Sequence, residues 1–344
     1  MTDVINKNIE SLRIGVVGAG SWGTALANLL AINGFKLDLW VFEKDVKEQI
    51  KNDNENKTFL PGARLSENIN PTNDIKKATA DKDLVLVVVP SHTMRETSKK
   101  INKYINKNAI VVTASKGIEN KTHLTMLEIL QENIEGLRKD QFAVLSGPSF
   151  AREVVQKLPT VVAIASTSAE TAKFVQKIFA APFFRVYTND DPVGVEIGGA
   201  IKNVIAIAAG ISDGLELGLN ARAALITRGL TEMRRLGDKM GANPHTFAGL
   251  TGVGDLLLTC TGTLSRNYTV GTQLGKGKTL DEILKEMKMV AEGVKTTRSV
   301  YNLSRKLGIE LPICNEVYKI LFENQSPQDS IPQLMTRALK HELD

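Results

Sequence analysis

The stretch Leu12–Gly23 reads LRIGVVGAGSWG, and it decides the fold of this chain. Its first half is a short apolar run that predicts a buried strand. Its second half, from Gly18 to Gly23, has the spacing G-x-G-x-x-G, and an Ala- and Leu-rich segment from about Trp22 to Asn33 follows it. A strand, a glycine turn and a helix in that order predict the phosphate-binding corner of a dinucleotide-binding unit.

Each glycine of the turn has its own physical role. Gly18 permits the tight turn, Gly20 lets the backbone approach a pyrophosphate, and Gly23 allows the helix to pack closely on the strand. The N-terminus of the helix offers unpaired N–H groups to the anion. The six-residue pattern alone is also typical of an ordinary glycine turn, and its position between a strand and a helix favours dinucleotide binding.

The second strand-like run, Leu37–Phe42, is followed at once by Glu43. An acidic side chain at this place can accept hydrogen bonds from the ribose hydroxyls and repels a 2′-phosphate, so it favours NAD over NADP. Two alternatives remain open: Lys44 could turn toward a 2′-phosphate, and Glu43 could simply face solvent. The predicted cofactor is therefore NAD, with NADP as a second possibility.

Further along the chain, strand-like and helix-like segments alternate up to about Asp190, and this alternation predicts a mainly parallel, doubly wound sheet. Beyond it the pattern becomes helical. The fold class is α/β, with an N-terminal Rossmann-type domain at 9–190 and a C-terminal all-helical domain at 191–340. The expected strands after the second are Leu84–Val89, Ala109–Val112, Ala143–Leu145 and Thr160–Ala165, and the expected helices are Val193–Ile211, Ala221–Met240, Leu280–Met287 and Thr296–Leu307.

Composition limits the class of protein. The 43 basic and 38 acidic residues give a net charge of +5, which is compatible with an anionic small molecule and equally with a solvated basic surface. No DNA-binding motif or basic patch with interleaved aromatic residues is evident, so we expect no nucleic-acid partner. Four scattered histidines and two distant cysteines, Cys260 and Cys314, predict neither a metal site nor a disulfide framework.

The same features predict a cytoplasmic protein without stable membrane insertion. Residues 1–8 contain charges and no apolar core, unlike a secretory signal. The segment Val193–Ile211 is apolar enough to be considered as a membrane span, but it contains Glu196, Lys202 and Asn203. Charged groups are costly in lipid, so a buried helix of a soluble protein is the better interpretation.

Lys202 is the first candidate for chemistry. An isolated ammonium group inside an apolar helix is costly, so it must be paired, neutralised or used. Desolvation lowers a lysine pKa toward neutrality, where the amine can transfer protons. Periodicity leaves a second interpretation equally open, in which the side chain extends to the edge of the helix and into solvent.

Four polar clusters accompany this lysine. Ser115–Gly117 and Gly147–Ser149 each follow a predicted strand, where ligands gather in open α/β sheets. The second of these could equally be a turn with a helix cap. Gly252–Thr259 includes Asp255, and Ser265–Asn267 places an arginine beside hydroxyl and amide donors, a set suited to a phosphate group.

Taken together, these segments resemble NAD(P)-dependent glycerol-3-phosphate dehydrogenase. The resemblance covers nearly the whole chain in the expected order, and it supplies the substrate, which composition and spacing do not. The matching stretches are Gly18–Ala25, Phe59–Gly62, Ala114–Glu119, Leu145–Ala151, Glu196–Val204, Gly249–Leu256, Ser265–Asn267 and Val290–Val294.

The resemblance implies interconversion of sn-glycerol 3-phosphate and dihydroxyacetone phosphate, in support of phospholipid synthesis. Lys202 would accept the proton when the alcohol is oxidised and return it when the ketone is reduced, with Lys116 and Asp255 tuning its charge. The other substrate contacts implied are Gly147, Ser149, Thr259, Ser265, Arg266 and Asn267. The positions implied near the dinucleotide are Ser21, Trp22, Lys116, Ala151, Arg266, Val290 and Glu292, beside the glycines, Phe42 and Glu43.

One departure concerns the cofactor. Many bacterial members have a basic residue after the second strand, whereas this chain has Trp40-Val41-Phe42-Glu43, closer to the eukaryotic NAD-linked form. Two alternative functions remain: another two-domain phosphosugar or hydroxyacid dehydrogenase, and a Rossmann redox sensor or nucleic-acid-binding module. A homodimer is compatible with the fold class.

Overall fold

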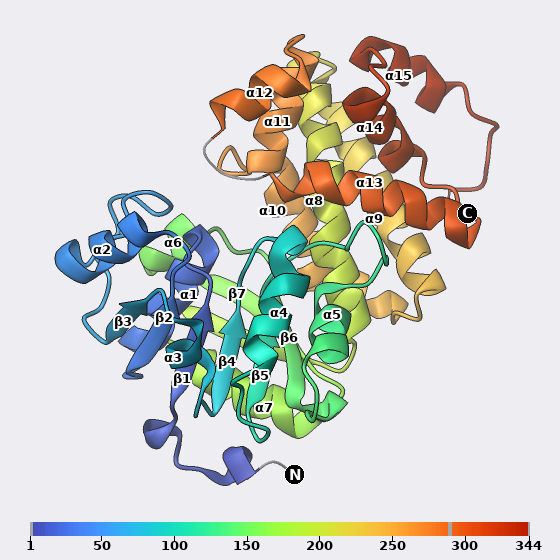
Figure 1. The fold of residues 1–344 in the computed structure, drawn as a ribbon. Helices are drawn as coiled ribbons and strands as arrows, with labels where there is room; N and C mark the ends of the chain where they lie inside the picture. Colours follow the sequence, from blue (N-terminus) through green and yellow to red (C-terminus); the bar gives the residue numbers. More distant parts are fainter. Residues whose placement is uncertain (1–2, 288–290, 343–344) are drawn as a thin grey trace.

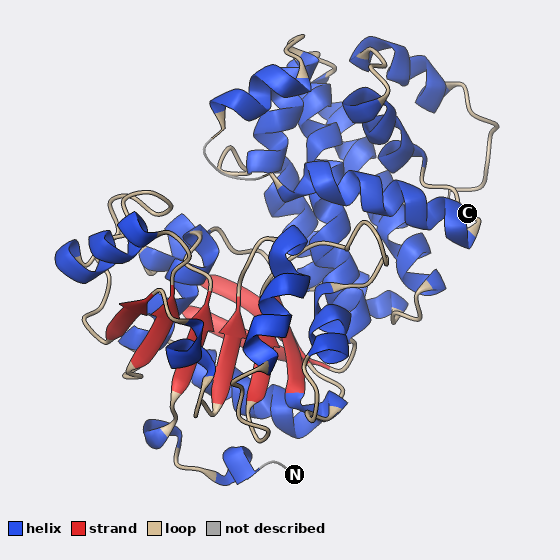
Figure 2. Cartoon of the chain, in the orientation of Figure 1, coloured by secondary structure: helices blue, strands red, loops and turns tan. Residues whose placement is uncertain are grey.

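The computed structural model describes residues 3–287 and 291–342, and in it an eight-stranded sheet forms one half of the chain (Figure 2). The strand order is β3-β2-β1-β4-β5-β6-β7-β8, so the chain moves outward from β1 in both directions, as in a doubly wound fold. The strands are β1 (Ile14–Val17), β2 (Leu37–Trp40), β3 (Ile69–Thr72), β4 (Leu84–Val87), β5 (Ile110–Thr113), β6 (Phe142–Ser146), β7 (Thr160–Ala165) and β8 (Phe184–Asn189).

All neighbouring strands are parallel except β6 and β7, which pair antiparallel. The pairing Ile14↔Leu37 and Ile14↔Leu84 places β1 between β2 and β4, and the carboxyl ends of these strands meet at one edge. The six strands predicted from sequence are all present. The prediction missed β3, which contains Pro71, and β8, whose alternate residues are exposed. Both lie at the sheet edges, where proline and polar residues are tolerated.

Helices cover both faces of the sheet, which explains why the central strands are buried on both sides. One face packs against α1 and α7, and the other against α4 and α5, which lie in front of the strands in Figure 1. The helices of this half are α1 (Ser21–Ile32), α2 (Lys44–Asp53), α3 (Ile75–Thr79), α4 (Met94–Asn102), α5 (Met126–Asn133), α6 (Ala151–Val155) and α7 (Ala169–Phe179).

From Pro192 to Met335 the chain is helical, apart from its loops and residues 288–290, which lie outside the described part. All four helices predicted there are present, and the prediction missed the shorter α10 and α11 and the last two, α14 and α15. The helices are α8 (Pro192–Gly214), α9 (Gly218–Lys239), α10 (Asp255–Thr261), α11 (Arg266–Gly275), α12 (Leu280–Glu286), α13 (Glu292–Leu307), α14 (Pro312–Phe322) and α15 (Pro327–Met335).

Helix α8 runs through the middle of this half, in contact with α9, α10, α11 and α13 (Figure 1). It is long and apolar enough to cross a membrane, but its most apolar window is entirely buried by protein. It begins at Pro192, whose preceding residue Asp191 accepts a hydrogen bond from the Gly194 amide at 2.9 Å. A carboxylate at the helix cap followed by proline is a strong start signal.

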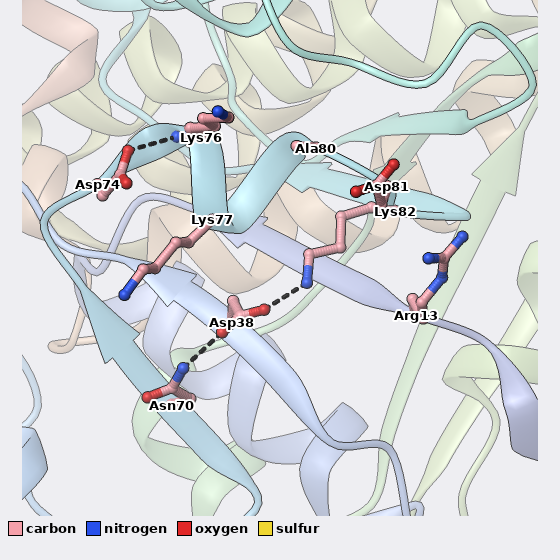
Figure 3. A pocket seen from close by; sticks show the side chains of 9 residues that line it. All are labelled: Arg13, Asp38, Asn70, Asp74, Lys76, Lys77, Ala80, Asp81 and Lys82. Carbon is pink, nitrogen blue, oxygen red and sulfur yellow. Dashed lines mark hydrogen bonds and ion pairs between the residues drawn. The ribbon is translucent and has the colours of Figure 1, made fainter.

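A surface pocket lies at the amino-terminal ends of β2 and β3, away from the glycine turn (Figure 3). Asp38 on β2 accepts hydrogen bonds from Asn70 on β3 and from Lys82, which precedes β4. In open α/β sheets, ligands bind at the carboxyl ends of strands. The role of this ion pair is therefore to tie neighbouring strands together, and the candidate active site lies at the opposite edge.

Candidate active site

The glycine turn between β1 and α1 has the shape of a phosphate cradle. Gly18 has φ +114°, and a Cβ added at Gly23 would lie 2.0 Å from the Gly18 carbonyl oxygen, so both positions require glycine. Gly20 differs, because no heavy atom lies within 4 Å of its would-be Cβ. It caps α1, and among the described residues no side chain makes a capping hydrogen bond to that helix end. Open space above unpaired helical amides fits a pyrophosphate.

Trp22 lies in the glycine turn, just before Gly23. Both Trp22 and Ala151, the first residue of α6, pack against the small apolar cluster of Ala25, Leu60 and Ala63. Within residues 3–287 and 291–342 the buried indole nitrogen of Trp22 has no hydrogen-bond partner. Ala151 and Trp22, both predicted near the dinucleotide, therefore lie together beside the glycine turn.

The carboxyl end of β2 presents Phe42 and Glu43. The ring of Phe42 is 72% exposed and meets Trp40 edge-on, with ring centroids 6.1 Å apart. Glu43 is partly exposed and lies at the N-terminus of α2, without capping it through its side chain. Its carboxylate is thus not used in capping α2, and its contact with a ribose stays a prediction.

Two glycines of α8 bring this helix close to the rest of the site. A Cβ added at Gly198 would lie 2.3 Å from the Thr251 carbonyl oxygen, in the π-helical turn η6 (Leu250–Gly254). A Cβ added at Gly199 would lie 3.0 Å from the Ser146 hydroxyl and 3.5 Å from Cγ of Lys116. Any larger residue would push α8 away from both neighbours. Lys202 is one turn further along this helix.

Lys116, Lys202 and Asp255 meet around a single carboxylate. Oδ2 of Asp255 lies 2.7 Å from Nζ of Lys116, and Oδ1 lies 2.9 Å from Nζ of Lys202. Lys116 follows β5, Lys202 lies in the middle of α8, and Asp255 is the first residue of α10, where the helix dipole favours a negative charge. Lys202 and Asp255 are buried, and Lys116 is only 18% exposed.

Thr259 completes this cluster. Its hydroxyl donates to the Asp255 carbonyl oxygen at 2.6 Å, one turn back in α10, and accepts a hydrogen bond from Nζ of Lys202 at 2.7 Å. Because the hydroxyl proton is directed to the carbonyl, the oxygen lone pairs face the lysine. The Lys202 ammonium is therefore paired and hydrogen-bonded inside the protein, and the alternative of a side chain extending into solvent is excluded.

The surroundings bring the pKa of Lys202 down to about 8. Burial is the largest cause, because it penalises the charged form, and the nearby Lys116 acts in the same direction. The Asp255 carboxylate opposes both and keeps the shift moderate. A lysine with this pKa exchanges protons readily near neutral pH.

The loop after β6 forms another part of the site. Gly147 has φ +142°, and Ser149 donates a hydrogen bond to its carbonyl oxygen at 3.0 Å. The sequence-based alternative of a helix cap at Ser149 is wrong, because α6 begins at Ala151 after Phe150. Ser146, which the sequence analysis did not select, has a buried hydroxyl without a partner among the described residues.

At the mouth of the site, Ser265 caps α11 by accepting a hydrogen bond from the Tyr268 amide at 3.2 Å. Arg266 is the next residue, with an exposed side chain whose pKa is lowered by partial desolvation and raised by the charge of Glu292. Glu292 also accepts hydrogen bonds from the amide and hydroxyl of Ser91, which follows β4. The two predicted residues Arg266 and Glu292 thus lie close enough to interact electrostatically.

Asn267 has a bridging position. Its amide nitrogen donates to Asn203 on α8 at 2.9 Å, and its carbonyl oxygen accepts a hydrogen bond from the Gly293 amide at 2.9 Å. The side chain thereby connects α8, α11 and α13. Val290, predicted near the dinucleotide, lies outside the described residues.

The comparisons with known proteins agree with this geometry. Two family models, NAD-dependent glycerol-3-phosphate dehydrogenase N-terminus and C-terminus, match residues 13–172 and 191–332. The chain belongs to this dehydrogenase family. It is 53% identical to glycerol-3-phosphate dehydrogenase [NAD(P)+] of Syntrophobacter fumaroxidans, over 96% of this chain and 97% of the relative, and 55% identical to that of Citrifermentans bemidjiense, over 96% and 98%.

A solved member of the glycerol-3-phosphate dehydrogenase family has the same fold. The crystal structure from Coxiella burnetii is 39% identical in sequence, covers 95% of this chain and 100% of its own, and superposes with a TM-score of 0.91. The Rossmann-type sheet followed by a helical half is therefore the fold of this family, as predicted from the sequence.

Sequence reasoning assigned no role in the candidate site to three polar residues that lie beside it: Ser91, Ser146 and Asn203. Asn203 is next to Lys202 in an apolar helix, and that position was a usable signal, because a buried amide needs hydrogen-bond partners. Ser91 and Ser146 gave no such signal. A serine at the end of a strand is common, and only the packing of α13 and α8 brings these two hydroxyls to the site.

Substitution by alanine should have different effects at Gly23 and Gly20, a loss of stability at the first and a loss of dinucleotide affinity at the second. Gly23→Ala should lower stability by about 1–3 kcal/mol, because its methyl group would overlap the Gly18 carbonyl. Gly20→Ala should leave the melting temperature nearly unchanged but weaken dinucleotide affinity by roughly tenfold, since the methyl group occupies the open space. Thermal unfolding and fluorescence titration with NADH measure the two effects, and equal affinity losses without a stability difference would contradict this assignment.

Proposed function

We propose that this chain interconverts sn-glycerol 3-phosphate and dihydroxyacetone phosphate, using NAD in preference to NADP. The observation that carries the proposal is the buried cluster of Lys202, Asp255 and Lys116, which lies at the same sheet edge as the glycine cradle. A proton-transferring lysine beside a dinucleotide site is what a secondary alcohol dehydrogenase requires. Family membership supplies the identity of the substrate.

Lys202 is the proposed general acid and base. During oxidation, neutral Nζ accepts the proton of the substrate hydroxyl as the C–O bond becomes a carbonyl, and during reduction the ammonium returns that proton to the oxygen. A nicotinamide held by the glycine cradle would supply the hydride chemistry at the same carbon. Thr259 orients Nζ through its hydrogen bond, and Asp255 compensates the charge when Lys202 is protonated.

Lys116 is proposed to contact both the reacting end of the substrate and the dinucleotide, because its side chain stays partly exposed while its Nζ is bound to Asp255. Arg266, at the N-terminus of α11, is proposed to hold the substrate phosphate together with the helix amides and Ser265. Gly147, Ser149 and Asn267 are proposed to complete the pocket. The negative charge of Glu292 is close enough to stabilise the charged form of the Arg266 guanidinium.

The first experiment is reduction of dihydroxyacetone phosphate with NADH and NADPH titrated side by side. We expect turnover with a preference for NADH, because Glu43 favours ribose hydroxyls over a 2′-phosphate. Glu43→Gln should reduce the preference for NADH over NADPH. Lys44→Ala is the matched control and should change the affinity for neither cofactor. An NADPH preference that is lost in Lys44→Ala would overturn the assignment to Glu43. Turnover only with a 3-hydroxy acid or a phosphosugar would overturn the substrate.

The pKa of Lys202 predicts opposite pH profiles for the two directions. Oxidation needs the neutral amine, so its kcat should rise as pH increases through about 8. Reduction needs the ammonium, so its kcat should fall over the same interval. Lys202→Ala should lower kcat by roughly 10²–10⁴-fold while NADH affinity stays near that of the wild type. Activity retained in Lys202→Ala with an unchanged profile would remove this residue from proton transfer.

Arg266→Ala should act on binding more than on chemistry. The loss of charged hydrogen bonds to a phosphate should raise KM for dihydroxyacetone phosphate roughly 10- to 100-fold, with a smaller change in kcat. Arg305→Ala, at the opposite end of α13 from Glu292, is the control and should leave KM unchanged. Steady-state kinetics decide the question, and an unchanged KM in Arg266→Ala would place the phosphate elsewhere.

We also propose a homodimer, supported by two highly exposed leucines on helices α9 and α10. Leu219 is 71% exposed and Leu257 is 51% exposed, so both offer apolar surface to a second copy of the chain. Light scattering should give twice the 37.5 kDa of the chain, and Leu257→Asp should shift the mass toward that of the monomer. A monomer mass for the wild type at micromolar concentration contradicts the proposal.

The remaining proposals concern organisation and role. We propose that residues 9–190 and 191–340 are the dinucleotide and substrate domains, since the sheet ends at Asn189 and α8 begins at Pro192. A cytoplasmic location agrees with the two buried, unbridged cysteines. There the chain is proposed to supply glycerol 3-phosphate for phospholipid synthesis, and growth of a cell lacking it without added glycerol 3-phosphate would contradict this role.

A further inference from the structure

A second buried acid of α8, Glu196, contacts the N-terminal half of the chain. Its side chain is 6% exposed, and Oε1 accepts a hydrogen bond from the Leu127 amide at 2.8 Å. Leu127 lies in the first turn of α5, whose cap residue Thr125 forms a reciprocal capping box with Glu128. Glu196 therefore satisfies an amide of α5 that the capping box leaves over.

This contact lies at the far end of the loop that carries Lys116. The Lys116 loop, residues 114–125, leaves β5, passes Lys116 and returns to the start of α5. Ile118 pairs with Thr125, and the Glu119 amide donates to the Leu124 carbonyl oxygen at 2.9 Å, so the two ends of the loop are joined. Displacement of the α5 end is therefore transmitted to the Lys116 end.

One ridge of α8 touches the loop at both ends. Glu196, Gly199 and Lys202 are spaced by three residues, and such residues form a continuous row along a helix. Glu196 binds the start of α5, Gly199 packs against the Lys116 side chain, and Lys202 shares Asp255 with Lys116. The helix that holds the proposed general base thus also holds the segment that positions its neighbouring cation.

We propose that Glu196 is a positioning residue that fixes the Lys116 loop against α8 and so sets the spacing of Lys116, Asp255 and Lys202. This inference rests on the function proposed above. Glu196 acts through the loop and does not need to touch the substrate.

The charge state of Glu196 indicates which substitute will function. Burial raises its pKa to about 7, opposed by the hydrogen bonds from Thr125 and the Leu127 amide and reinforced by the charge of Glu128. The contact therefore operates with the acid partly neutral at physiological pH. Glutamine offers the same carbonyl acceptor and nearly the same shape without a charge, so Glu196→Gln should preserve the contact.

The chain offers a matched control in Glu232 on α9. It is equally buried, its pKa is also raised to about 7 by burial, and it accepts hydrogen bonds from the Ile313 and Cys314 amides at 2.6 and 3.1 Å. It thereby stabilises the N-terminus of α14, within the helical half and apart from the Lys116 loop. A purely structural effect of losing a buried helix-binding acid should appear equally in both positions.

The experiment compares Glu196→Ala, Glu196→Gln and Glu232→Ala in kcat, in the pH profile of dihydroxyacetone phosphate reduction and in hydrogen exchange of the free protein. Glu196→Ala should lower kcat by roughly 10²-fold, the effect of a misplacement of about 1 Å. The pH at which its kcat for reduction falls should move upward from about 8, because Lys116 no longer lowers the pKa of Lys202 by repulsion. Amides of residues 116–127 should exchange faster. Glu196→Gln should restore all three properties.

Glu232→Ala should instead lower the melting temperature and speed exchange at the start of α14, with kcat and its pH dependence unchanged. The proposal is overturned if the pH at which kcat for reduction falls is unchanged in Glu196→Ala, or if Glu232→Ala shifts this pH equally. If Glu196→Ala does not fold, Glu196→Asp, which withdraws the carboxylate by one methylene, replaces it. Hydrogen exchange needs no turnover, so an inactive wild type would refute the proposed function and leave the test of loop positioning intact.

Discussion

The shared carboxylate of Asp255 is the interaction on which the site depends. It binds one lysine from the loop after a sheet strand and one from the central helix, so it connects the two halves of the chain. Two buried or nearly buried ammonium groups would be prohibitive without it, and one carboxylate cannot fully compensate two cations. The arrangement therefore favours loss of a proton from the more deeply buried lysine, Lys202.

Close packing of α8 against its neighbours allows both lysines to reach Asp255. Helix α8 approaches η6 through Gly198, the Lys116 side chain through Gly199 and α11 through Gly210, whose added Cβ would lie 2.1 Å from the Tyr268 carbonyl oxygen. A helix surrounded on every side must be apolar on every side, which is why its sequence resembles a membrane span. Its few polar residues are then conspicuous, and Glu196, Lys202 and Asn203 each have a hydrogen-bonded partner in a neighbouring element.

Sequence patterns predicted the elements that are continuously apolar and missed those that are partly exposed or begin with polar residues. The central strands and α8 are continuous apolar runs, so their pattern is unambiguous, whereas β3 and β8 are edge strands with proline or exposed residues. Helices α10 and α11 were read as polar clusters because each begins with site residues, Asp255 in one and Arg266 in the other. The residues of the cluster could be named from the family resemblance. That both lysines share the Asp255 carboxylate depends on how the helices pack, and the sequence pattern does not contain this information.

The balance around Lys202 explains why the proposed proton transfer by one amine needs three charged groups. A lysine at its ordinary pKa would remain charged at neutral pH and could not accept a proton from an alcohol. A lysine buried without a carboxylate would be neutral and could not donate a proton to a ketone. Asp255 and Lys116 act in opposite directions on the same group, and the resulting pKa of about 8 leaves both forms populated. In the proposed mechanism, the positions of Lys116 and Asp255 therefore control the direction in which the site works best at a given pH, and the contacts that hold these two residues act on proton transfer through Lys202.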